Sequence, residues 1–68
     1  MAINKQGLRV ALQKEQTKLI RQKDAISATK AYIGVVGESE KEVNKLARQE
    51  AAARETQDNI AKIEAALK

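Results

Sequence analysis

The sequence predicts an all-α protein in which two long antiparallel helices form a coiled-coil-like helical hairpin. Three observations support this fold class. The 68-residue chain contains no proline, and residues with high helix propensity dominate both halves. The residues that interrupt this pattern in the middle of the chain are confined to positions 34–39. Apolar residues recur every seven positions on both sides of that interruption, which is the spacing of a coiled coil.

We predict one domain over residues 1–68, with helices at about 5–33 and about 40–67 and a turn at about 34–39. At about 1.5 Å per residue each helix would be roughly 42 Å long. Two helices of similar length joined by a short connection are expected to pack antiparallel.

The start of the helix at 5–33 is indicated by its capping residues. Asn4 is a residue type that accepts a hydrogen bond from the first helical turn. Ile3 and Leu8 have the spacing of a hydrophobic staple. Gly7 weakens this first turn, because glycine loses more backbone freedom than any other residue.

The turn between the helices has its own local signals. Ser39 and Glu42 form a capping-box pattern, in which each side chain can bond to the other residue's backbone amide. Upstream, either Gly34 or Gly37 can supply the residue of positive φ that ends the preceding helix.

The predicted hairpin core is an apolar ladder that repeats every seven residues on each helix and reaches Ile33 on the first. A register in which paired positions sum to 72 gives each paired residue an apolar partner on the other helix. The pairs are Leu12 with Ile60, Leu19 with Ala53, and Ile26 with Leu46. The predicted core residues are Leu12, Leu19, Ile26, Leu46, Ala53, Ile60 and Leu67.

The same register predicts a second ladder beside the first, and this ladder is mostly polar. Its expected pairs are Leu8 with Glu64, Glu15 with Gln57, Gln22 with Glu50, and Thr29 with Val43. Carboxylate and amide layers of this kind either specify register and oligomeric state from inside a bundle or face water. Because only one ladder is apolar, the seam is thin, and we expect a homo-oligomer, in the form of a dimeric four-helix bundle.

Several apolar residues fall outside the main ladder. A second copy of the chain or an unrelated partner protein can cover them. These candidate docking or oligomer contacts are Ile3, Val10, Ile20, Tyr32, Val35 and Val36.

The composition argues against catalysis. No histidine or cysteine is present, so no disulfide can form and the usual zinc and iron–sulfur ligands are missing. Glu15 and Gln22 opposite Glu50 and Gln57 could look like a carboxylate cluster in a bundle core, but di-metal sites of that kind also use histidine. The segment 34–37 lacks the spacing and the lysine of a phosphate-binding loop. We predict no enzyme activity, no cofactor and no bound metal.

The net charge of +4 is unevenly distributed. Residues 1–33 carry seven basic and two acidic side chains, whereas residues 34–68 carry six basic and seven acidic ones. Lys14, Lys18 and Arg21 form one basic ridge that could contact phosphates or a partner. Tyr32 is the only aromatic residue, so stacking on unpaired bases is not expected.

The longest apolar runs, such as 35–36 and 51–53, are too short to cross a membrane or to form a signal peptide. Membrane-surface binding is disfavoured, because the basic residues do not flank the apolar stripe cleanly. We predict a cytoplasmic protein.

In length and makeup the chain resembles many small inhibitors, adaptors and assembly proteins, including phage-encoded ones. We therefore expect a non-enzymatic protein-interaction module that binds another macromolecule through a helical surface. The alternative is a nucleic-acid-binding helical bundle that contacts phosphates through the basic helix at 5–33.

Overall fold

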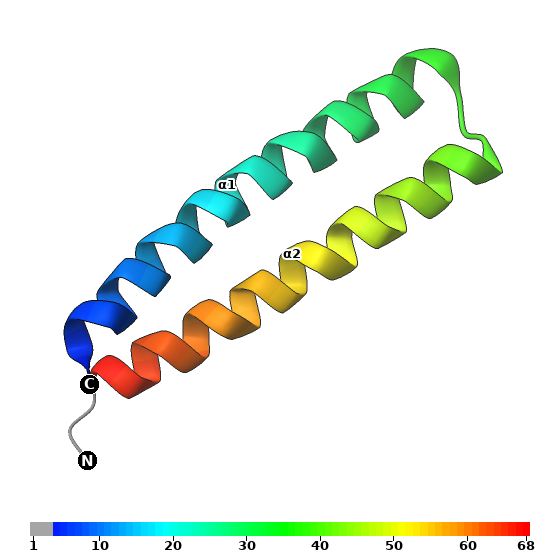
Figure 1. Cartoon of the computed structure of the whole chain (residues 1–68). Coiled ribbons are helices and arrows are strands. Elements are labelled where there is room, and N and C mark those ends of the chain that lie inside the picture. The colour runs from blue at the N-terminus through cyan, green and yellow to red at the C-terminus, as the bar shows by residue number, and fades with distance from the viewer. Residues whose placement is uncertain (1–3) are drawn as a thin grey trace.

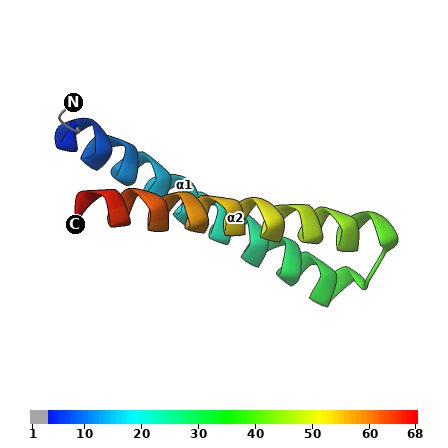
Figure 2. The same cartoon turned by 90° about the horizontal axis from the view of Figure 1, so that it is seen from below.

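The computed structural model describes residues 4–68, and over this range the protein is an all-helical hairpin. Helix α1 spans Lys5–Val36 and helix α2 spans Glu40–Leu67. The two helices run antiparallel (Figure 1) and cross at a small angle when viewed from below (Figure 2). The predicted fold class, two long helices packed as a hairpin, is confirmed.

Both helices begin at the predicted capping residues. The Asn4 side-chain oxygen accepts a hydrogen bond from the Gly7 backbone amide at 3.0 Å. The Ser39 hydroxyl accepts one from the Glu42 amide at 3.3 Å. Each bond satisfies one of the amides that a helix N-terminus otherwise leaves without a partner. The staple predicted between Ile3 and Leu8 involves a residue outside the described range.

The predicted end of the first helix at residue 33 is wrong, because α1 continues to Val36 and the turn contains only residues 37–39. Gly34 lies within the helix, and Gly37 adopts the positive φ of 100°. The Gly37 amide donates to the Ile33 carbonyl at 2.8 Å and closes the last turn. Glycine inside a helix costs only about 1 kcal/mol relative to alanine, so Gly34 alone does not end α1.

The seam between the helices buries very little. Among the described residues only Thr29, Ala53 and Thr56 are buried, at 5%, 7% and 1% exposure. Of the predicted core, Ala53 is therefore the one buried residue. The remaining predicted core residues are half-buried: Leu12, Leu19, Ile26, Leu46, Ile60 and Leu67. Threonine hydroxyls take two of the three most buried positions.

The hairpin is elongated, measuring 53 × 15 × 14 Å. Its radius of gyration is 15.7 Å, against about 11 Å for a compact domain of this length. The accessible surface is 5342 Å², whereas a compact monomer of this mass exposes about 4,200 Å². Roughly 1,100 Å² is thus exposed beyond what a closed fold of the same size would leave in water.

Candidate interaction surfaces

A hydrogen bond across the seam shows how the two helices are aligned. The Thr29 hydroxyl contacts Gln49 Oε1 at 2.7 Å and the Ala25 carbonyl at 3.0 Å, and it shares its single proton between these acceptors. Thr29 therefore lies opposite Gln49. The predicted pairing of Thr29 with Val43 is wrong, and Val43 is 43% exposed.

The second ladder on α2 lies one residue earlier than predicted. Thr56 is almost fully buried, whereas its neighbour Gln57 is exposed, as is Glu64. The predicted pairings of Glu15 with Gln57 and of Leu8 with Glu64 are wrong for the same reason. The residues that occupy this ladder are Glu42, Gln49, Thr56 and Ile63 on α2, together with Leu8, Glu15, Gln22 and Thr29 on α1.

The cost of burying charge explains the difference. The predicted ladder would have placed Glu50 and Glu64 in the seam, and a carboxylate without a partner is expensive to bury. The observed ladder places neutral Gln49, Thr56 and Ile63 in the seam, and its one carboxylate on α2, Glu42, lies in the first turn of that helix. Both sets repeat every seven residues, so the spacing alone could not distinguish them. Glu50, predicted to lie near Gln22, instead lines a depression on another side of the seam.

Two polar atoms of this ladder are shielded from water without a hydrogen-bond partner. They are Glu15 Oε2 and Gln22 Oε1, both on α1. The Thr56 hydroxyl, by contrast, donates to the Ala52 carbonyl of its own helix at 3.1 Å. A buried acceptor without a donor costs about 1–3 kcal/mol, so the isolated hairpin leaves two such costs uncompensated.

The flanks of the seam form two different faces. We call one the alanine face, because it includes a depression lined by Thr29, Tyr32 and Lys45 and continues along alanines of both helices. Spacing by seven places eight flanking residues on it: Ala11, Lys18, Ala25, Tyr32, Lys45, Ala52, Asn59 and Ala66.

We call the opposite side the charged face. Lys23, Lys30, Glu50 and Gln57 line a common depression there, beside Ile26 of the apolar ladder. The same spacing places eight flanking residues on this face: Arg9, Gln16, Lys23, Lys30, Val43, Glu50, Gln57 and Glu64. Cations of α1 thus flank the same seam as carboxylates of α2.

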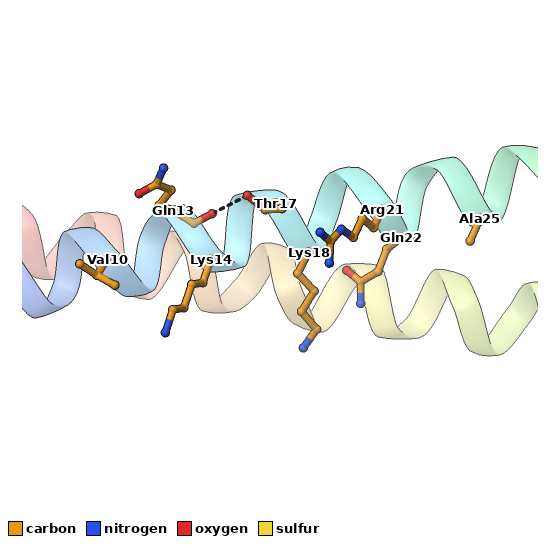
Figure 3. A pocket seen from close by; sticks show the side chains of 8 residues that line it. All are labelled: Val10, Gln13, Lys14, Thr17, Lys18, Arg21, Gln22 and Ala25. Carbon is orange, nitrogen blue, oxygen red and sulfur yellow. Dashed lines mark hydrogen bonds between the residues drawn. The ribbon is translucent and has the colours of Figure 1, made fainter.

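The predicted basic ridge lies along one depression of α1. Lys14, Lys18 and Arg21 line it together with Val10 and Gln22 (Figure 3). The Lys14 and Lys18 side chains extend to the same side of the helix (Figure 3). The structure therefore brings together the three cations that the sequence singled out, whereas Lys23 and Lys30 lie on the charged face.

The candidate docking residues do not form one continuous patch. Tyr32, Val35 and Val36 lie within the last turns of α1, at the turn end of the hairpin, where Val35 is 87% exposed. Ile20 and Val10, at 62% and 42% exposure, lie further along α1. The remaining candidate, Ile3, is outside the described residues. Val43, which the 72-sum register placed in the seam opposite Thr29, is instead exposed in the first turn of α2 and adds to the exposed apolar residues.

Two further properties concern residues 4–68. No group of three or more acidic side chains in this range is close enough to hold a metal ion. Neither described helix combines the length and the apolar character that crossing a membrane requires.

Comparison with known proteins identifies no relative: no protein family, no curated protein and no solved structure matches the chain.

Proposed function

We propose that this protein is a non-enzymatic helical interaction module that assembles into a dimeric four-helix bundle and binds another macromolecule through its helical surface. Such a module would act as an adaptor, inhibitor or assembly factor. It would occupy a site on its partner rather than transform a substrate.

The observation that supports this proposal is the large exposed surface of the hairpin relative to its small buried core. The hairpin exposes roughly 1,100 Å² more than a compact monomer of its mass. A standard protein–protein interface removes about 800 Å² from each partner. Association through one face of this size would therefore remove most of the excess exposed surface.

The test is sedimentation equilibrium combined with circular dichroism over a range of about 1–100 μM chain. We expect a dimer whose helicity and melting temperature rise with protein concentration, because association stabilises the folded state by mass action. A fully helical monomer with concentration-independent melting would contradict the proposal.

One observation favours a second candidate function, the binding of a nucleic-acid duplex. Lys14, Lys18 and Arg21 line a common depression, and neutralising phosphates releases counterions from the duplex. With one aromatic side chain in the chain, such binding would rely on charge and shape rather than base stacking.

The test of this candidate compares two charge-reversal variants. Lys14→Glu with Lys18→Glu should abolish salt-dependent affinity for duplex DNA or RNA. Lys23→Glu with Lys30→Glu changes the net charge equally but alters the charged face, and it should retain more of the affinity. Equal losses in both variants would mean that the ridge has no specific role and that only net charge matters.

A further inference from the structure

We infer that two copies of the hairpin pack through their alanine faces, antiparallel to each other, about a two-fold axis at the level of Gln22. This inference rests on the proposed function, and it specifies the surface and the orientation of the self-association. The partner is a second copy of this chain.

The composition of the two faces favours the alanine face. In a helical bundle the apolar stripe of each helix is widened by one of the two flanking positions. Five of the eight flanking residues of the alanine face are alanine or tyrosine, against one apolar residue, Val43, among the eight of the charged face. The alanine side chains also leave room for another pair of helices to approach closely. Two of the eight residues of this face carry a charge, Lys18 and Lys45, against five of the eight on the charged face.

The unpartnered atoms lie on the ladder beside this face. Glu15 Oε2 and Gln22 Oε1 can only accept hydrogen bonds, so each needs a donor that its own chain does not provide. If only apolar groups covered this ladder, water would be excluded and the free-energy cost of these two unpaired acceptors would increase. A second copy instead brings amide donors of the same ladder.

The position of Gln22 along the hairpin axis allows it to pair with the same residue of a second copy. The Thr29–Gln49 bond aligns positions that sum to 78, which places Gln22 at the level of buried Thr56. This level lies near the middle of α1, which spans Lys5–Val36. When two copies overlap along their full length, Gln22 therefore meets the partner's Gln22. Each side-chain amide can then donate from Nε2 to the other's Oε1, in the reciprocal manner of a two-fold interface.

The charge of Glu15 distinguishes the two possible orientations. In a parallel dimer Glu15 would lie at the level of the partner's Glu15, and two carboxylates would face each other inside the bundle. Glu15 and Thr29 lie seven residues on either side of Gln22. An antiparallel dimer therefore places Glu15 at the level of the partner's Thr29 and Gln49. Gln49 already uses its Oε1 with Thr29, and its Nε2 is the donor that Glu15 Oε2 requires.

The first experiment measures the dimer dissociation constant of three double variants by sedimentation equilibrium. Ala25→Glu with Ala52→Glu places long charged side chains on the alanine face and should weaken the dimer by about 100-fold or more, because they replace small alanines where the helices approach closely and would have to lose their water. Ala31→Glu with Ala51→Glu makes the same substitution at exposed positions outside both faces and should change the constant by less than about threefold. Gln16→Glu with Gln57→Glu tests the charged face in the same way.

The outcomes separate this inference from the proposed function. A monomeric wild-type protein would contradict self-association itself. A dimer that is weakened by the charged-face variant and not by the alanine-face variant would retain the proposed function and overturn the inference. Because Ala25 and Ala52 are exposed in the hairpin, circular dichroism at high concentration should show that their variant still forms helices.

The second experiment tests the orientation by cysteine cross-linking, which is simplified because the chain has no cysteine. Gln22→Cys should form a disulfide-linked dimer in mild oxidant. Ala11→Cys should not, because in an antiparallel pair the two copies of position 11 lie 22 residues apart, about 33 Å along the helix. Disulfide formation at position 11 as efficient as at position 22 would contradict the antiparallel arrangement, and none at position 22 would exclude the axis proposed here.

Discussion

The two ladders of the seam differ in chemistry, although they share one spacing and lie side by side. One ladder consists of leucine, isoleucine and alanine, and its members are mostly half-buried. The other contains Thr29 and Thr56, two of the most buried residues of the hairpin. Apolar contact is tolerant of small shifts, whereas a hydrogen bond such as Thr29–Gln49 requires one alignment. The apolar ladder thus supplies attraction between the helices, and the polar ladder determines their register.

The largest expected effect comes from disrupting the apolar ladder. Leu19→Asp places a charge against the opposite helix and should lower the free energy of unfolding by about 3 kcal/mol or more. Ile26→Asp should act in the same way. Helicity and thermal melting by circular dichroism measure the loss.

Ile20→Asp is a matched control for this change. It introduces the same charge one residue away, at a side chain that is 62% exposed, and it should cost less than about 0.5 kcal/mol. Equal melting of the Leu19→Asp and Ile20→Asp variants would show that the apolar ladder does not hold the hairpin together.

An intermediate effect is expected when the polar ladder is made apolar. At concentrations where the hairpin is monomeric, Gln49→Leu with Thr56→Val should stabilise it by about 2 kcal/mol, because apolar groups replace buried polar ones. In the dimer the loss of the Gln49 donor to Glu15 should offset part of this gain. A domain of this size would then melt roughly 10 °C higher. Cross-linking and sedimentation should at the same time show more than one species. The variant lacks the Thr29–Gln49 hydrogen bond, which fixes the alignment of the two helices.

The residues that follow Gln49 and Thr56 in the sequence provide a control for the variant that changes these two positions. Glu50→Leu with Gln57→Leu repeats the change one residue later, where Gln57 is exposed. It should create an apolar stripe, increase light scattering and leave the stability of the discrete species unchanged. If this pair were the stabilising one, the ladder would lie where the 72-sum register placed it.

The smallest effect isolates one hydrogen bond. Thr29→Val keeps the shape of the side chain and removes the donor to Gln49, and it should cost about 1 kcal/mol. Thr17→Val is the control, because the Thr17 hydroxyl also donates to a carbonyl four residues earlier at 3.0 Å but is exposed and makes no contact across the seam. Thermal melts of the two variants should differ by roughly 4–8 °C. Adding Gln49→Leu to Thr29→Val should recover the loss, because no acceptor is then left unpaired.

Much of this fold could be predicted from local rules. The N-caps at Asn4 and Ser39, the range of α2 and the apolar ladder all follow from short-range chemistry and period-seven spacing. The end of α1 was missed because Gly34 and Gly37 carry the same local signal, and the choice between them depends on how the last turn of the helix closes.

The alignment of the polar ladder could not be obtained from spacing alone. Gln49 and Glu50 are equally periodic, and their separation into seam and charged face depends on the electrostatic cost of burial. The ridge of Lys14, Lys18 and Arg21 was predictable as a helical face. Its shared depression, and the unpartnered atoms of Glu15 and Gln22, depend on how side chains pack against the second helix.

The hairpin begins and ends at the same end of its long axis, since the start of α1 and the end of α2 lie together and the turn lies at the opposite end (Figure 1). Fluorophores attached near the start of α1 and at the end of α2 would therefore report on geometry at one pole of a 53 Å rod. In an antiparallel pair the labelled poles of the two copies point in opposite directions, and resonance energy transfer between the copies is weaker than in a parallel pair. A parallel pair would bring donor and acceptor together and quench the donor strongly.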